Sequence, residues 1–384
     1  MRLSLLTTVA AATAASTTTT PSYTDGRNHN KDLTVSEAPD HLRAYVLPKF
    51  HGRGIYLSPT QIIRFSITTN SSDGAFSLIQ HTGKVSDWLI ARPHTHKLVH
   101  EHFYSSRGRS ELWAQKDQAS PQEAKVAWAG DYGNIPEGTI HTFQLIDPDS
   151  QLSHIFHPAG FERLFDAYSL GDFHSTVGAP YLPDPADAQP YGPVTPKEYK
   201  KLTGLDVWPV EEKDFLPRRD FINGTAGDVT ANWHNGTNVL PAAQDQPYFV
   251  ANNYGPKFLN TESGYKVIQP LATPEQGNFT VGTVIMSPRL HNETAACATL
   301  PHHFALQMDE GHLVLRVDGY KETSLLQGDV AFIPANTGFS YYAKVPFTRF
   351  MYMNNGVKGL DYELLKTAKP WGFPSYPIYA GYKP

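Results

Sequence analysis

A short stretch of the chain is rich in side chains that bind transition metals. Residues 92–102 read Arg-Pro-His-Thr-His-Lys-Leu-Val-His-Glu-His, with four histidines and one glutamate. Neutral imidazole is the commonest ligand of Cu, Zn, Fe and Ni, and a carboxylate offsets part of the charge of a dication. Side chains two residues apart on a β-strand share a face, so His94 and His96 can direct both imidazoles toward one ion. The pattern predicts a metal site that needs a further ligand from elsewhere.

A second segment supplies that ligand. Residues 130–141 hold two turn signals around a short strand-forming stretch and end on His141. Within the first segment the remaining ligand is open to choice. Glu101 brings negative charge, while His100 and His102 are rivals because an unbroken strand would place them on the face of His94 and His96.

The elements that must position these side chains are short strands. Leu313, Leu315 and Val317 alternate with their neighbours, and Asp318-Gly319 then supplies a turn. The chain has 30 Pro and 29 Gly, which favours many turns, and we find no long amphipathic helical pattern. The prediction is an all-β protein built from antiparallel sandwiches or barrels of the jelly-roll kind.

The chain also contains an internal repeat, with a spacing of about 200 residues. Gly130-Asp131 and Ile135-Pro136 match Gly328-Asp329 and Ile333-Pro334 at an identical offset. A length of 384 residues suits two domains. We therefore expect one domain over residues 40–175, a second over 246–384, and a long Pro-rich interdomain linker over 176–245.

The two ligand segments together resemble the paired motifs of the cupin superfamily, Gly-x5-His-x-His-x(3,4)-Glu-x6-Gly and Gly-x5-Pro-x-Gly-x2-His. The first motif, without its leading glycine, fits His94, His96, Glu101 and Gly108, and the second fits Gly130, Pro136, Gly138 and His141. The interval from Glu101 to Gly108 selects Glu101 as the fourth ligand. It requires a loop or bulge before Glu101 and leaves His100 and His102 behind the ligands or at the site entrance. The resemblance implies a bicupin.

The second half keeps the scaffold of the repeat but not its ligands. Aligning Gly319 with Gly108 places Ala305, Gln307 and His312 at the positions of the first three ligands, and Phe339 at that of His141. We expect no tight metal binding there, and a second cupin that braces the first or closes a homodimer.

The chain after its leader resembles the fungal quercetin 2,3-dioxygenases, bicupins with one intact N-terminal site. Phe103 and Phe143 follow two ligands at a spacing of two residues, where that family has aromatic residues beside the flavonol, and Tyr56 matches a further pocket tyrosine. The resemblance implies Cu(II) as the metal, with Fe, Mn or Ni as alternatives for this ligand set. It also implies that Glu101 takes the proton of the flavonol 3-hydroxyl, and that reaction with O2 releases carbon monoxide and a phenolic ester, a depside.

Other functions share parts of this pattern. A secreted cupin oxygenase that tailors another phenolic or polyketide metabolite would keep the same ligands and aromatic walls. An oxalate-degrading bicupin would need a small polar pocket and usually two intact sites. A non-catalytic bicupin, for storage or glycan binding, has no need of four ligands in register.

The chain ends and composition predict where the protein works. Residues 1–15 have the charged start, apolar stretch and small-residue cleavage pattern of a signal peptide, too short to cross a membrane. Asn-x-Ser/Thr triplets lie at Asn70, Asn223, Asn235, Asn278 and Asn292, and a single cysteine, Cys297, excludes an internal disulfide. A net charge of −5, without a basic stripe, argues against nucleic acid. We expect a secreted, extracellular glycoprotein whose partners are a small phenolic molecule and O2, with no membrane partner.

Overall fold

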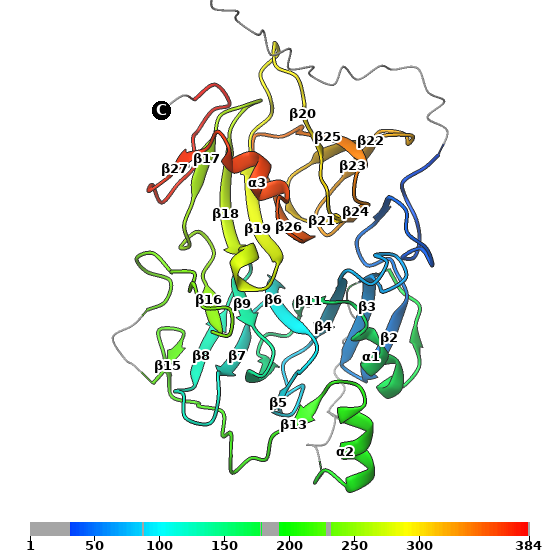
Figure 1. Ribbon diagram of the computed structural model, residues 1–384, viewed down its shortest axis with the longest axis vertical. Coiled ribbons are helices and arrows are strands. Elements are labelled where there is room, and N and C mark those ends of the chain that lie inside the picture. The colour runs from blue at the N-terminus through cyan, green and yellow to red at the C-terminus, as the bar shows by residue number, and fades with distance from the viewer. Residues whose placement is uncertain (1–30, 87, 177, 179–191, 228–231, 383–384) are drawn as a thin grey trace, which may run out of the picture.

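The computed structural model describes residues 31–86, 88–176, 178, 192–227 and 232–382, so the predicted signal peptide lies outside the described residues. Strands dominate, and the α-helices of this part are the short α1 (Glu162–Tyr168), α2 (Pro196–Thr203) and α3 (Leu360–Leu365). Two β-barrels are stacked along the long axis, the first blue to green and the second yellow to red (Figure 1). The predicted class, an all-β bicupin of two jelly-roll domains, is confirmed.

The first barrel is formed by two antiparallel sheets. One has the order β13 (Trp208–Pro209), β5 (His94–Thr95), β10 (Ile140–Leu145), β7 (Ser110–Gln115), β8 (Glu123–Ala127), β15 (Thr225–Ala226), β14 (Phe221–Ile222). The other has the order β12 (Asp172–Phe173), β2 (Gly54–Ser58), β3 (Gln61–Ile67), β4 (Ser77–Gly83), β11 (Ser150–His157), β6 (His100–Arg107), β9 (Tyr132–Ile135), β16 (Tyr248–Val250). Inward side chains of both sheets, such as Phe103, Leu112 and Phe143, share one buried core.

The second barrel repeats this plan. Its larger sheet has the order β1 (Tyr45–Leu47), β24 (Val330–Ile333), β21 (Phe304–Glu310), β26 (Thr348–Asn355), β19 (Phe279–Met286), β18 (Lys266–Ala272), β17 (Phe258–Asn260), β27 (Lys369–Pro370). The smaller sheet has the order β20 (Ala296–Thr299), β25 (Gly338–Ala343), β22 (Leu313–Val317), β23 (Thr323–Leu325). A short 3₁₀ turn, Pro274–Gln276, precedes β19.

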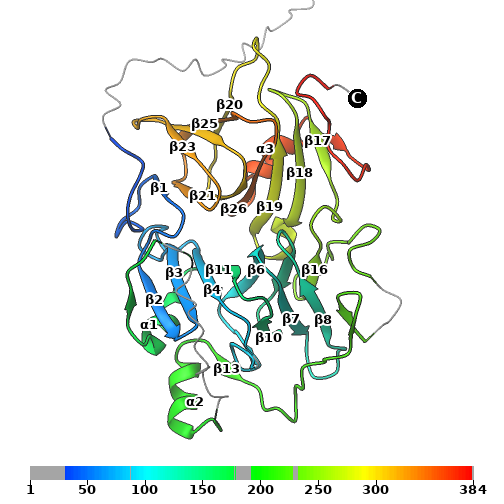
Figure 2. The ribbon, with the colours of Figure 1, turned by 180° about the vertical axis from the view of Figure 1, so that it is seen from behind.

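The two barrels exchange edge strands, which alters the predicted domain limits. β1, expected within the first domain, pairs with β24 of the second barrel, and β16, expected within the second, pairs with β9 of the first. Figure 2 labels both exchanged strands, β1 and β16. Each exchanged strand covers an edge whose backbone N–H and C=O groups would otherwise lack partners. A buried cluster that includes Tyr45, Tyr132 and Phe279 fills the junction, so the barrels interlock.

The predicted linker is part of the first barrel rather than a separate connection. Within its described part, β13 pairs with β5, and β15 pairs with β8. Helix α2 buries Leu202 in a cluster with Phe165 of α1. No helix among the described residues has the length and apolar character needed to cross a membrane.

The structure corrects the alignment of the two halves. Gly108 turns the chain between β6 and β7 with φ 67°, and Gly311 makes the same turn between β21 and β22 with φ 86°. Both turns need the left-handed backbone that glycine adopts without a steric penalty. Gly311 is therefore the equivalent of Gly108. The predicted match of Gly319 to Gly108 is wrong, because Gly319 follows the next strand, β22.

With this register, strand pairing identifies the residues that stand where the ligands do. Glu101 pairs with Ile135, and Phe304 makes the equivalent pair with Ile333. His94 pairs with His141, as Ala298 does with Phe339. The positions equivalent to the four ligands are thus Ala298, Leu300, Phe304 and Phe339, all without a metal-binding atom.

Two of the three residues that the Gly319 alignment placed at the first ligand positions lie at the junction of the barrels. Ala305 belongs to the cluster between the barrels, and the Gln307 amide oxygen accepts hydrogen bonds from Ser153 and Gln80 of the first barrel. The second barrel therefore braces the first through this face.

Candidate metal centre

Four predicted ligands come together inside the first barrel. The potential ligand atoms of His94, His96, Glu101 and His141 lie within 4.8 Å of one another, and all four residues are buried. Glu101 Oε2 is 3.2 Å from His96 Nε2 and 3.0 Å from His141 Nε2. Pairing between β5 and β10 places His94 directly opposite His141. Glu101 and His141, which are 40 positions apart in the sequence, thus belong to one compact cluster.

The structure has the interruption of the strand that the choice of Glu101 as ligand requires. β5 ends at Thr95 and β6 begins at His100, so residues 96–99 form a loop. Along β6 the side chains alternate, and His100 and His102 therefore face away from Glu101. They join His157 in a second histidine group packed on Phe279 of the other barrel. The three imidazole planes lie within 11°, 18° and 25° of one another, so the rings are stacked face to face rather than turned edge-on toward one shared point, as ligands of a single metal ion usually are.

The buried position of His100 makes the stability of the protein pH-dependent. Burial lowers the pKa of His100 to about 4, against about 6.5 in the unfolded chain. Below about pH 6.5 the unfolded state therefore binds more protons, and this contribution to stability is lost as the pH falls toward 4. Between pH 7 and pH 5, we expect His100 alone to reduce the free energy of unfolding of the metal-free protein by about 2 kcal/mol.

Urea unfolding at the two pH values measures this effect. In His100→Gln the loss between pH 7 and pH 5 should be smaller by about 2 kcal/mol, whereas the exposed His41→Gln should behave like the wild type. Equal losses in His100→Gln and wild type would contradict the expected role of His100.

Backbone carbonyls fix the orientation of the three imidazoles. The Nδ1 atoms of His94, His96 and His141 lie 2.8, 2.7 and 3.0 Å from the carbonyl oxygens of Arg92, Asp206 and Thr139. A carbonyl only accepts, so Nδ1 carries the hydrogen and each neutral ring presents its Nε2 lone pair to the centre of the cluster. This is the arrangement that orients histidines for metal binding.

The donor set fits a cation. Without one, Nε2 lone pairs of His96 and His141 would face the Oε2 lone pairs of Glu101 at 3.2 and 3.0 Å, which needs a proton or a metal ion between them. Burial raises the pKa of Glu101, but the close contacts with the imidazoles of His141, His154 and His96 outweigh burial and hold that pKa well below its ordinary value. Three imidazoles and one carboxylate suit Cu, Fe, Mn or Ni.

Asp206, in the linker segment, holds the ligand loop and was not found from the sequence. Its carboxylate accepts hydrogen bonds from the backbone N–H groups of Lys97, Leu98 and Val99 at 2.9, 2.9 and 3.2 Å. Its backbone carbonyl accepts a hydrogen bond from Nδ1 of His96. One residue thus fixes both the loop and a ligand ring. Its distance of more than 100 positions from the loop leaves no local signal in the sequence.

Removing the charge of Asp206 should weaken metal binding. Asparagine tolerates the left-handed backbone at this position, φ 61°, but offers one acceptor oxygen in place of two. Because residues that hold ligands typically contribute 10- to 100-fold to metal affinity, we expect a loss of about tenfold in Asp206→Asn. Competition with a chelator measures it, with the exposed Asp214→Asn as the control. An unchanged affinity in Asp206→Asn would show that the loop holds without it.

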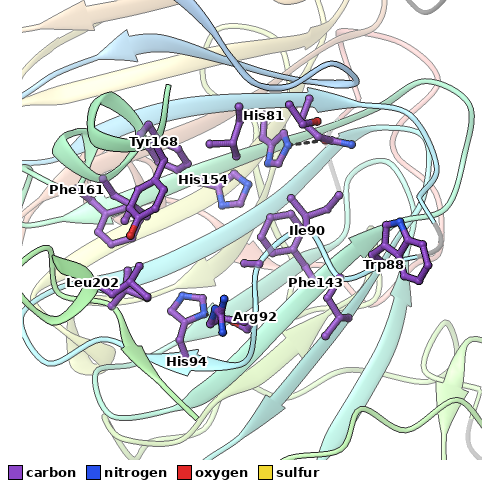
Figure 3. A pocket seen from close by; sticks show the side chains of 18 of the residues that line it. His81, Trp88, Ile90, Arg92, His94, Phe143, His154, Phe161, Tyr168 and Leu202 are labelled. Atoms are coloured by element: carbon purple, nitrogen blue, oxygen red, sulfur yellow. Dashed lines mark hydrogen bonds between the residues drawn. The ribbon is translucent and has the colours of Figure 1, made fainter. Parts of the chain in front are cut away.

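A cavity of about 430 Å³ opens beside the cluster (Figure 3). Glu101 and His94 form part of its wall, together with His81 and His154. The remaining wall is mainly apolar and includes Leu57, Ile90, Phe143, Phe156, Phe161 and Leu202. Its size falls within the range of about 300–1,000 Å³ that is usual for small-molecule sites. The linker forms one side of it through α2.

The three aromatic residues predicted at the substrate pocket have different places. Phe143 lines the cavity. Phe103 is not among the lining residues. It lies behind Phe143 and His154, with ring centroids 5.6 and 4.9 Å away. Tyr56 is also outside the lining and packs on Phe173 at 5.1 Å. Its neighbour Leu57 faces the cavity instead, because adjacent side chains of a strand point to opposite sides.

Two jelly-roll barrels, of which the first holds the one histidine and glutamate cluster found among the described residues, define a bicupin that binds a metal ion. The chain is 37% identical over 350 residues to a quercetin 2,3-dioxygenase from Aspergillus japonicus, covering 90% of this chain and 98% of the relative. A second quercetin 2,3-dioxygenase, from Bacillus subtilis (strain 168), is 27% identical over 140 residues, 36% of this chain and 38% of the relative. The chain belongs to the quercetin 2,3-dioxygenase family, and it is a dioxygenase of a small molecule.

Comparison with solved structures gives weaker similarity. An oxalate decarboxylase from Lactobacillus farciminis in complex with formate matches with a TM-score of 0.48 and 14% identity, over 83% of this chain and 89% of that one. A variant oxalate decarboxylase from Bacillus subtilis matches with a TM-score of 0.49 and 16% identity, over 84% and 79%. No family model matches the sequence.

Proposed function

We propose that this dioxygenase uses Cu(II) to open the heterocyclic ring of a flavonol such as quercetin. The observation that carries the proposal is the position of Glu101, whose carboxylate touches two ligand histidines and also lines the apolar cavity. A substrate hydroxyl that enters the cavity therefore meets a base beside the metal-ligand cluster. An oxalate-sized substrate would leave most of this apolar cavity unfilled.

The metal would be held by His94, His96, Glu101 and His141. When bound, Cu(II) would supply a Lewis-acidic and redox-active centre that acidifies the substrate hydroxyl and couples it electronically to O2. The ligand histidines need no proton exchange, because carbonyls keep their Nδ1 hydrogens in place.

Glu101 would act as the general base. Its lowered pKa keeps the carboxylate ionised at neutral pH, so it can accept the proton of the flavonol 3-hydroxyl. The apolar walls exclude water from the deprotonated substrate, and Phe143 offers a ring face to a flat aromatic ligand. In the proposed overall reaction both atoms of O2 enter the product, one ring carbon leaves as carbon monoxide, and a phenolic ester remains.

Gas analysis tests the proposal. Purified protein with its metal content determined would be incubated with quercetin in air. We expect about one carbon monoxide released and one O2 consumed for each quercetin lost, with about one copper per chain. Turnover of another phenol, without carbon monoxide from any flavonol, would overturn the flavonol assignment and leave the protein as an oxygenase of a different aromatic substrate.

We also propose that the protein is exported and glycosylated. In support, the predicted sequon asparagines Asn70, Asn223, Asn235, Asn278 and Asn292 are all solvent-exposed. Their side chains are therefore accessible to glycan attachment. Protein isolated from its natural source should lose mass on treatment with an N-glycosidase and should begin near residue 16. An intact start and an unchanged mass would contradict export.

A further inference from the structure

His154 is a buried histidine on β11, and only one of its two ring nitrogens contacts the metal-ligand cluster. The residue is 2% exposed. Its Nδ1 atom lies 2.7 Å from the carboxylate oxygen Oε1 of Glu101. The other carboxylate oxygen, Oε2, faces His96 and His141. Figure 3 shows the His154 ring at the wall of the cavity, on the side away from His94. His154 therefore lies beside the base on the wall of the space for substrate.

The hydrogen bond to Glu101 fixes what the opposite side of the ring can do. A carboxylate accepts hydrogen bonds, so the hydrogen of this contact is on Nδ1. In the neutral imidazole Nε2 is then an acceptor. Nε2 is buried and has no hydrogen-bond partner among the residues that the structure describes. Buried nitrogen without a partner is rare in folded proteins because desolvation costs free energy that no bond offsets.

The surroundings of this nitrogen are aromatic rather than polar. The rings of Phe103 and Phe143 contact His154 with centroids 4.9 and 5.2 Å away. His81, the other imidazole of the wall, stacks on His154 at 5.8 Å, and its own Nε2 bonds Gln61 at 2.7 Å. His154 Nε2 is thus an acceptor in a wall that otherwise favours flat apolar ligands.

We propose that His154 Nε2 accepts a hydrogen bond from a phenolic hydroxyl of the substrate, other than the hydroxyl that Glu101 deprotonates. The site then selects polyhydroxylated aromatic substrates over those with a single hydroxyl, because only a donor satisfies this nitrogen. The inference rests on the proposed flavonol activity. It makes His154 a specificity-determining residue, coupled to the base through Nδ1.

Equilibrium binding to the metal-loaded protein under anaerobic conditions tests the inference without turnover. The probes are quercetin and 3-hydroxyflavone, which lacks every hydroxyl except the one at position 3. Trp88, at the cavity wall, supplies a fluorescence signal. His154→Asn keeps an amide N–H near the position of Nδ1 and removes Nε2. We expect its affinity for quercetin to fall about tenfold and its affinity for 3-hydroxyflavone to change less than about twofold.

A second variant guards against misfolding. In His154→Gln the longer amide reaches the position of Nε2 with an acceptor oxygen, and it should retain most of the preference for quercetin. Unchanged metal content and thermal unfolding show that both variants are folded. Equal losses of affinity for both ligands, or no loss for either, would overturn the role proposed for His154 and would leave the proposed flavonol activity standing. Failure of the wild type to bind either flavonol would overturn the proposed function, and with it the substrate class inferred for His154.

Discussion

Glutamine in place of Glu101 is expected to lower kcat by about 100- to 10,000-fold while the metal ion is retained. The amide has nearly the shape of the carboxylate and still presents an oxygen to His96 and His141, but it cannot accept a proton. Loss of a positioned general base typically has an effect of this size. O2 consumption gives the rate, and elemental analysis of the same samples gives the metal content.

A matched variant separates this effect from loss of charge in the barrel. Glu123→Gln removes a half-buried carboxylate from β8, outside the cluster, and should leave kcat within about twofold. If Glu101→Gln loses metal in proportion to activity, Glu101 is a ligand without a role as base. If its kcat stays within about threefold of the wild type, the proton goes to another group.

The ligands could be predicted from the sequence because each depends on local rules. His94 and His96 share a face through strand alternation, and His141 follows a turn whose glycines and proline are visible in the sequence. Even the loop before Glu101 followed from the spacing to Gly108. These relations reach only a few residues along the chain.

The supporting residues depend on long-range contacts and could not be predicted. Asp206 reaches the ligand loop only because the linker adds β13 beside β5. His154 meets Glu101 because β11 pairs with β6 in a register that no local pattern fixes. Phe103 had the right spacing for the pocket, yet it does not line the cavity and instead packs against Phe143, which does.

The second half shows how a repeated turn signal misleads. Gly311 and Gly319 both follow strands and both have left-handed backbones, so either could match Gly108. The pairing of Phe304 with Ile333 decides for Gly311, and this pairing exists only in the folded sheet. The exchange of edge strands between the barrels could not be predicted for the same reason. Nothing in the sequences of β1 and β16 indicates which sheet each strand joins.

Removing the imidazole of His141 is expected to lower metal affinity by about 100- to 1000-fold. A four-ligand transition-metal site contributes roughly 10–16 kcal/mol of binding free energy, so one ligand accounts for about 2.5–4 kcal/mol. His141 is 1% exposed, and its Nε2 lies 3.0 Å from Glu101, so no other described side chain can easily take its place. His141→Ala should therefore purify with little metal and without measurable dioxygenase activity.

The matched control is His100→Ala, which removes a histidine that is also buried and lies next to Glu101 in sequence. The His100 ring stacks on His102 and His157 at the junction of the barrels, so its loss should leave about one metal ion per chain. Chelator competition and elemental analysis compare the two variants directly. The reverse result, with metal lost from His100→Ala and kept by His141→Ala, would assign the ion to the stacked histidines at the junction and would remove Glu101 from its vicinity as base.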